Sequence, residues 1–512
     1  MNSPYDRREF LSVAARTSTT LIAGAAMFKE MPAMAEVTTT SEVRIRNDDG
    51  TVDLKSLNSL LILDRESVAD SDQASFHLNP AKKHPENPVL LPGEPQQWDS
   101  LQVIWPGTVL YDADDKLFRC WYSGLDAVQK NRPPLWVPGY AESKDGLNWT
   151  KPDLGQYKHN DLPTNRILVD WSHHVISTVV MNPDRSDPQR RFLALWHNAT
   201  NEGYRKVLAS SPDGKAWKNE GIAYTPVDQQ RTSFFDISQL IFQPDAADEN
   251  DRVIGYAQAY RDYNGTNVRQ IGVVHGPHPG ALKEYGTTDE EFLALRPEKG
   301  IDEEVHFASV GKFGNQYVML FESDRFSQNP NHGDLRLAVS SDGRKFRRVH
   351  PKTPMIATGP KGMWDENLLV TTTTSFQEVG DEIWIYYFGC PNVFRRWPYG
   401  HTGDLRGSLY YPSYLGLATL PRDRFAYAAG PGSVTTPSLS IGEQGLWLNA
   451  DGEEIVVTCL SPDGGTLAEG RLLDSPKQAL YRKVQWTTKP PRQPCQIKIA
   501  LANNQRVYSL RY

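Results

Sequence analysis

The chain contains little cysteine and has no excess of positive charge. It has four cysteines in 512 residues, too few for a disulfide-held scaffold, so a hydrophobic core must hold the fold. Its 55 Lys and Arg are outnumbered by 62 Asp and Glu, which gives a net charge of −7. Nucleic acids and anionic membrane surfaces are bound by basic faces, so this balance argues against both as partners.

Long apolar runs are also missing after residue 35, where no segment approaches the roughly 18 apolar residues of a membrane helix. We therefore expect no membrane span. Residues 1–35 carry Arg7-Arg8, an interrupted apolar stretch from Leu11 to Phe28, and the small-residue site Ala33-Met34-Ala35. This segment resembles a twin-arginine signal peptide. The resemblance implies export of the folded protein to the periplasm or the cell exterior of a bacterium. The alternative is a short amphipathic N-terminal helix.

Turn-forming and aromatic residues are abundant instead. The chain has 38 Gly, 36 Pro, 13 Trp and 22 Tyr, and 39% of its residues are hydrophobic. Glycine and proline favour turns and aromatic residues favour strands, so the composition predicts a soluble all-β protein with an ample core. The sequence predicts one helix, Thr288–Leu295, where Thr288 and Glu291 have the spacing of a capping box.

A hairpin motif recurs in the middle of the chain. The segments Ser143–Trp149, Ser211–Trp217 and Ser341–Phe346 each carry Asp-Gly, with an aromatic residue three positions after the glycine. Asp-Gly is typical of tight hairpin turns, and the aromatic residue covers the adjacent sheet. The copies are about 65 residues apart, or twice that, which is a propeller-blade period. We predict a five-bladed β-propeller over residues 36–430, with three unrelated hairpins as the alternative.

Short apolar or β-branched runs at the same period are the expected inner strands of the five blades. These runs are 103–111, 175–181, 237–242, 305–310 and 368–373. The linker Ala429–Ser433 contains two glycines and a proline and is expected to end the propeller.

Residues 433–512 alternate in polarity and predict a small C-terminal β-sandwich. Ile497, Ile499 and Leu501 share one side of a strand, and polar residues lie between them. Cys459 and Cys495 both lie in the expected strands. Two states stay open for them: a disulfide in an oxidising compartment, or two buried thiols.

Three features together resemble a known group of enzymes: the hairpin motif, the segment Trp364-Asp365-Glu366 before a β-rich run, and the ending Val507–Tyr512. The group comprises exported bacterial glycoside hydrolases with a five-bladed propeller and a C-terminal sandwich, in the invertase-like and arabinanase-like clans. The resemblance covers most of the chain after residue 35. It implies an Asp base or nucleophile, a Glu acid and a supporting Asp on different blades. The invertase motif Asn-Asp-Pro-Asn has no clear counterpart, so the sugar stays open.

Carboxylates at the starts of the expected inner strands are the candidate catalytic groups, because inner strand ends of a propeller meet at one axial mouth. Glycoside hydrolysis needs two carboxyl groups at one bond, one of them kept protonated. The candidates are Asp99, Asp236, Glu304, Asp365 and Glu366. Asp236 and Glu304 begin adjacent blades and are the preferred pair. Each candidate has a structural alternative as a loop cap or turn residue.

Aromatic rings and hydrogen-bonding side chains near the same mouth are the candidate sugar contacts, because sugar faces stack on flat rings. They are Trp105, His173, His174, His306, Glu322, Arg325 and Trp364. For the tryptophans the alternative is a core position. The histidines are not spaced as metal ligands, so no metal or cofactor is expected.

These observations predict an exported glycoside hydrolase that acts on a plant or algal polysaccharide or its oligosaccharides. A glycoside phosphorylase or transglycosylase on the same fold is one alternative, and His173, His174 and Arg325 keep a phosphate site open. A non-catalytic glycan-binding propeller is the other. Two carboxyl groups that face each other favour an enzyme, whereas a flat aromatic groove favours binding.

Overall fold

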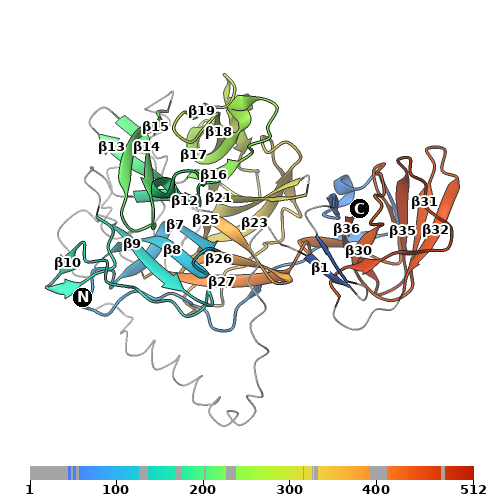
Figure 1. Cartoon of the computed structure of the whole chain (residues 1–512), viewed down its shortest axis with the longest axis horizontal. Coiled ribbons are helices and arrows are strands. Elements are labelled where there is room, and N and C mark those ends of the chain that lie inside the picture. Colours follow the sequence, from blue (N-terminus) through green and yellow to red (C-terminus); the bar gives the residue numbers. More distant parts are fainter. Residues whose placement is uncertain are drawn as a thin grey trace, which may run out of the picture. The chain divides into compact units, whose positions relative to one another are not determined.

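Almost all regular structure in the described residues is β-strand (Figure 1). The computed structural model describes residues 44–47, 50–53, 57–125, 137–168, 175–200, 203–226, 238–314, 316–325, 327, 332–391, 412–473 and 479–512. None of the helices in these residues is long and apolar enough to cross a membrane.

The predicted helix and its capping box are confirmed, but the helix is shorter than predicted. Helix α2 (Asp289–Phe292) begins after the N-cap Thr288, which exchanges hydrogen bonds with Glu291 in both directions. The following residues form strand β20 (Leu293–Leu295), which is fully buried and pairs with β18. Strand pairing and burial of these apolar residues therefore end the helix after one turn.

Five antiparallel units of three to five strands follow one another along the described chain (Figure 1). The first is β7 (Gln102–Asp112), β8 (Leu117–Leu125) and β9 (Val137–Ser143). The second is β12 (Val175–Met181), β13 (Phe192–Thr200), β14 (Gly203–Ser211) and β15 (Lys218–Tyr224). The third is β16 (Ser238–Phe242), β17 (Val253–Tyr263), β18 (Thr266–Gly276) and β19 (Lys283–Glu284), with β20 at its side.

The last two units are joined by a single parallel bridge between Gly333 and Leu368. The fourth is β21 (Glu304–Phe313), β22 (Gln316–Arg325), β23 (His332–Ser340) and β24 (Arg347–Val349). The fifth is β25 (Leu368–Val379), β26 (Glu382–Cys390) and β27 (Tyr414–Pro421), completed by β6 (Lys82–Lys83) from the N-terminal part of the chain.

The first strands of the five units contact one another in a closed series. Strand β7 contacts β12, β12 contacts β16, β16 contacts β21, β21 contacts β25, and β25 returns to β7. Each of these strands overlaps one of the five predicted inner strands, so the prediction of inner strands is confirmed for the described residues. This closed series of strand contacts supports the predicted five-bladed propeller, and the exact number of blades stays a prediction.

The recurrent Asp-Gly segments form turns with one shared geometry. Gly146, Gly214 and Gly343 have φ of +74°, +75° and +74°, a conformation that L-residues with a side chain rarely adopt. Each glycine N–H donates to a serine Oγ three residues earlier, at 2.8–2.9 Å. In the third copy this serine is Ser340, and not Ser341 as the sequence motif suggested.

An aromatic side chain from a neighbouring unit closes each of these turns. Tyr386 on β26 donates to the Gly146 carbonyl at 2.9 Å, and Tyr256 on β17 donates to the Gly343 carbonyl at 2.8 Å. Trp121 on β8 donates to the Gly214 carbonyl at 2.7 Å. The contacts therefore link the fifth unit to the first, the first to the second, and the third to the fourth.

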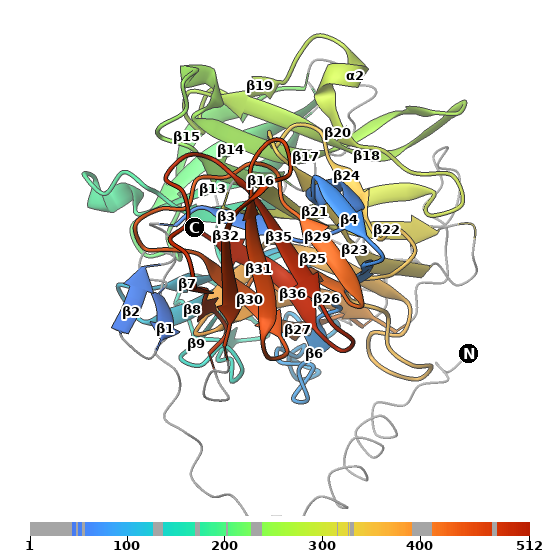
Figure 2. The same ribbon diagram turned by 90° about the vertical axis from the view of Figure 1, so that its right-hand side faces the viewer.

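Two further sheets form the C-terminal part, as predicted, and Figure 2 shows β32, β31, β35 and β29 side by side in one of them. That sheet contains β34 (Gln485–Trp486), β32 (Thr466–Leu472), β31 (Ile455–Leu460), β35 (Gln496–Leu501), β29 (Gly432–Thr435) and β4 (Asp70–Asp72). The other contains β33 (Arg482–Lys483), β30 (Trp447–Asp451), β36 (Arg506–Arg511), β28 (Ala426–Ala429), β5 (Ser75–Leu78) and β3 (Ser59–Leu61).

The domain boundaries predicted from sequence need a correction here, because both ends of the chain build these sheets. Strands β3, β4 and β5 pair with β36, β29 and β28, so residues 59–78 do not belong to the propeller. The predicted alternation is confirmed, since Ile497, Ile499 and Leu501 lie in the core between the sheets. The three N-terminal strands are only three or four residues long, too short to show alternation of their own.

Candidate functional site

Asp99 and Asp365, two candidate catalytic residues, are engaged by structural partners. Asp99 is 1% exposed and its Oδ2 accepts from Lys151 Nζ at 2.5 Å and from the Tyr122 hydroxyl at 2.7 Å. Asp365 is 2% exposed and its Oδ2 accepts from Lys83 Nζ at 2.5 Å and from the Tyr387 hydroxyl at 3.2 Å. These contacts favour a structural role for both aspartates.

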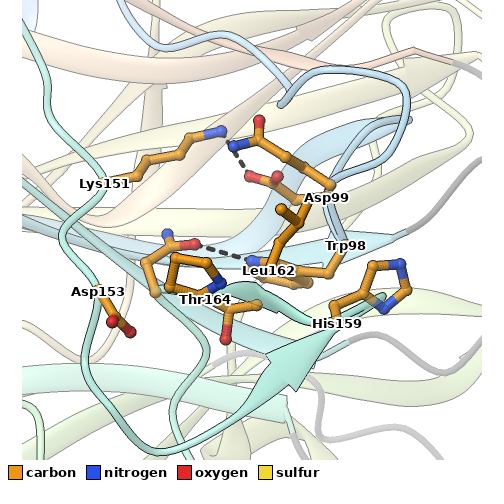
Figure 3. A pocket seen from close by; sticks show the side chains of 10 residues that line it. Trp98, Asp99, Lys151, Asp153, His159, Leu162 and Thr164 are labelled. Carbon is orange, nitrogen blue, oxygen red and sulfur yellow. Dashed lines mark hydrogen bonds and ion pairs between the residues drawn. The ribbon is translucent and has the colours of Figure 1, made fainter.

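A cavity of about 160 Å³ lies beside Asp99 (Figure 3). Figure 3 shows Lys151 and Asp99 on one side of it and His159 on another. Trp98 is 4% exposed and donates from its indole N–H to Asn165 at 2.8 Å, so its ring faces are not available for stacking on a sugar. Asn165 in turn donates to the Tyr122 hydroxyl at 2.7 Å. The polar groups of this cavity thus mainly satisfy one another.

Glu366, a further candidate catalytic residue, and several predicted sugar contacts also have structural neighbours. Trp364 is 4% exposed and stacks on Tyr387 with ring centroids 5.7 Å apart, which places it in the core. Glu366 accepts from the Gly362 N–H. Arg325 forms an ion pair with Asp334 at 2.8 Å. Trp105 is half-buried and meets the Phe307 ring edge-on at 5.7 Å. Trp105 and Arg325 both lie near the cluster described below, because Phe307 packs against His306 and Arg325 follows Asp324.

Three candidates lie outside the described residues: Asp236, His173 and His174. Nothing in the structure bears on their predicted roles.

A buried group of carboxylates lies where the inner strand of the fourth unit begins. Glu304 is the first residue of β21, and in the antiparallel register Asp324 of β22 lies opposite it. Glu322 is two residues before Asp324 and therefore projects from the same face of β22. The side chains of Glu304, Glu322 and Asp324 are all under 5% exposed. We call these three residues, with Arg269 and His306, the carboxylate cluster.

Arg269 is the cation of the carboxylate cluster. It comes from β18 of the third unit, and its guanidinium donates to Glu304 Oε2 at 2.8 Å. Its backbone N–H donates to the other oxygen, Oε1, at 3.2 Å. Glu304 is thereby held by two hydrogen bonds, one of which comes from a charged guanidinium.

Neither of the other two carboxyl groups forms an ion pair with an arginine of the described residues, and the pKa of each is raised. Burial raises the pKa of Glu322 well above its usual value, and the neighbouring Asp324 adds to this, while Arg269 opposes it. Burial, aided by Glu304, raises the pKa of Asp324 to about 7, against the opposing charges of Arg269 and Arg325. Oε2 of Glu322 and Oδ1 of Asp324 are buried without a hydrogen-bond partner. The cluster therefore combines a carboxyl group paired with a guanidinium and two carboxyl groups whose pKa values are raised.

His306 completes the carboxylate cluster on β21. Its Nδ1 lies 3.5 Å from Glu322 Oε2, and its ring packs against Phe307 with centroids 4.0 Å apart. Burial and the Arg269 charge lower the pKa of His306 well below its usual value, so the imidazole is neutral. Within the described residues, no group of three or more His, Cys, Asp or Glu side chains is arranged to hold a metal ion.

Sequence reasoning selected Glu304, Glu322 and His306 but missed Asp324 and Arg269. Asp324 was detectable, because it alternates with Glu322 along a strand and shares its face. Arg269 was not, because it is 35 positions from Glu304 and comes from another unit.

No protein-family model and no curated protein matches the sequence. Solved structures resemble it at low identity. A structure titled "Glycoside hydrolase" has a TM-score of 0.45 and 14% identity over 67% of this chain and 92% of that chain. A β-1,2-mannobiose phosphorylase from Listeria innocua has a TM-score of 0.41 and 14% identity over 66% of this chain and 96% of that chain. An N-acetylgalactosamine deacetylase from F. plautii has a TM-score of 0.42 and 14% identity over 68% and 96%. The three differ in activity, and likenesses of this size do not choose among activities.

Proposed function

We propose that the protein is a carbohydrate-active enzyme that cleaves glycosidic bonds at the carboxylate cluster. One observation carries the proposal: the pKa values of Glu322 and Asp324 are raised, and beside them Glu304 is paired with Arg269 at 2.8 Å. Glycosidic cleavage needs one carboxyl group that protonates the leaving oxygen and a second that supplies the base or nucleophile, and carboxyl groups in two such different environments meet this requirement.

In this proposal Glu322 donates the proton to the leaving oxygen, and Asp324 helps to raise the pKa of Glu322. The basic or nucleophilic carboxylate is Glu304, or Asp236 from the sequence prediction. The half-buried Trp105 packs on the buried Phe307, which in turn packs on His306 of the cluster. The sugar, the linkage and the stereochemistry are left to experiment.

The test is a screen of the purified protein on aryl glycosides and on plant, algal and fungal polysaccharides, each with and without inorganic phosphate. On any substrate that is cleaved, Glu322→Gln and Glu304→Gln should each lower kcat by roughly 10²-fold or more, because they keep shape and remove the proton chemistry. The matched control is Glu303→Gln. Glu303 is next in sequence to Glu304, and the Glu303 carboxylate accepts from the Ser327 N–H at 2.7 Å. It should leave turnover unchanged.

Each other outcome points to one of the alternatives. Turnover that requires phosphate and releases a sugar phosphate would identify a phosphorylase. Saturable glycan binding without turnover of any substrate would identify a glycan-binding propeller. Full turnover in Glu322→Gln and Glu304→Gln would remove the carboxylate cluster from the reaction, and Asp236→Asn would then be the next variant.

We also propose that the protein is exported through the twin-arginine pathway to the periplasm or the cell exterior. Arg7 and Arg8 support this proposal, together with the Ala-Met-Ala site that follows. Replacing both arginines with lysine should retain the precursor in the cytoplasm, because lysine lacks the planar guanidinium. Cell fractionation of the two forms is the measurement, and normal export of the Lys-Lys form would exclude this route.

A further inference from the structure

The two ring nitrogens of His306 have different surroundings. Nδ1 faces Glu322 Oε2 at 3.5 Å, whereas Nε2 is buried without a hydrogen-bond partner. The side chain is nine-tenths buried, and Phe307 packs against the ring with centroids 4.0 Å apart, which limits its rotation. A buried polar nitrogen with no partner costs free energy, which a ligand that supplies the missing hydrogen bond would recover.

The proton on Glu322 determines which nitrogen of His306 carries hydrogen. When the proton of Glu322 lies on Oε2, the oxygen that faces Nδ1, that nitrogen is the acceptor, so that the ring hydrogen resides on Nε2. An ionised Glu322 would instead accept from an Nδ1–H and leave Nε2 as an acceptor. The groups of the cluster that act on this pair are Glu304 and Asp324, which favour the protonated Glu322, and Arg269, which opposes it.

We propose that His306, whose Nδ1 faces Glu322, uses its Nε2–H to bind a hydroxyl oxygen of a neutral sugar beside the carboxylate cluster. His306 is thus a substrate-positioning residue, and this inference rests on the proposed function. A neutral sugar is indicated because the imidazole is uncharged and the guanidinium of the cluster, Arg269, is already paired with Glu304.

Two isosteric variants separate the roles of the two nitrogens. His306→Gln places an amide N–H near the position of Nε2 and keeps a donor for the ligand. His306→Asn places its amide near the position of Nδ1 and leaves no donor at Nε2. The Asn variant should lose about 10- to 100-fold in kcat/KM, mainly through KM, and the Gln variant should recover most of this loss. Thermal melting of both variants checks that they fold alike.

A second measurement does not depend on turnover. Long-range ¹H–¹⁵N spectra of the imidazoles, with His306→Gln to assign the signal, report which nitrogen carries the hydrogen. We expect the neutral Nε2–H form at pH 7. Titration with neutral methyl hexosides and pentosides should shift that Nε2–H signal, and methyl glucuronoside should not.

The outcomes separate this inference from the proposed function. An imidazolium or an Nδ1–H form at pH 7 would overturn the inference even if the enzyme cleaves glycosides. Equal kcat/KM in the Asn and Gln variants would do so as well, as would an Nε2–H signal that none of the neutral glycosides shifts. If no glycoside is cleaved but neutral methyl glycosides shift the signal, the proposed reaction fails and the binding role of His306 stands.

Discussion

Asp99 and Asp365 occupy equivalent positions in two Gly-x4-Trp-Asp segments of the chain, and each binds one lysine and one tyrosine. In both copies the tryptophan stacks on that tyrosine, at 6.0 Å for Trp98 and 5.7 Å for Trp364. In both copies a Cβ on the glycine would collide with the aspartate Oδ1, so glycine is required there. The first unit and the fifth thus share one structural motif, a Gly-x4-Trp-Asp segment whose aspartate binds a lysine and a tyrosine.

This relationship predicts that Asp99→Asn and Asp365→Asn reduce stability and not catalysis. Each variant leaves a lysine ammonium without its carboxylate in a largely buried setting, which should cost about 3 kcal/mol of unfolding free energy. Urea unfolding measures the loss, and turnover per folded molecule should stay close to that of the parent. A large loss of kcat in a variant that retains its stability would return that aspartate to the list of catalytic candidates.

The aromatic residues that close the Asp-Gly turns should stabilise contacts between units. Tyr386→Phe and Tyr256→Phe each remove a hydroxyl that donates to a turn carbonyl and leave the ring packing intact. We expect each to lower the free energy of unfolding by about 1 kcal/mol, because one buried acceptor loses its partner. Chemical denaturation of the single variants and of the pair checks this, and unchanged stability in both singles would contradict it.

Stability should depend on pH through Asp324. Burial raises its folded-state pKa from the usual value of an aspartate to about 7, so the folded protein binds a proton more tightly than the unfolded chain. The stabilising contribution of that proton is complete below about pH 4 and is lost as pH rises toward about 7. Asp324→Asn cannot ionise, so the variant should lose less stability than the parent between pH 5 and pH 8. Melting temperatures across this range decide the question; parallel pH profiles would show that Asp324 is ionised throughout.

The four cysteines are free and buried, and burial raises the pKa of each thiol. The thiols of Cys459 and Cys495 interact with each other in the C-terminal sheets. We expect a thiol reagent to modify none of the cysteines in the native protein and all four after unfolding, because only an accessible thiolate reacts. Protein isolated after export that gives two reactive thiols on unfolding would show that Cys459 and Cys495 have formed a disulfide.

The sequence was sufficient for the features that depend on neighbouring residues. The capping box at Thr288 and Glu291, the glycine turns at Gly146 and Gly214, and the alternation at Ile497 and Ile499 were all predictable. Each is determined by local backbone geometry or by a strand's period of two. The inner strands were found for the same reason, since five apolar runs recur at one period.

Only the tertiary structure determined which charged side chains lie next to one another. Asp324 joins Glu304 because of strand register, and Arg269 reaches Glu304 from another unit; neither distance can be read from sequence separation. The same holds for Lys151, which is 52 positions from Asp99 and gives that aspartate a structural partner. A carboxylate's role depends on its burial and on the charges within a few ångströms, and both are set when strands from separate parts of the chain pack together.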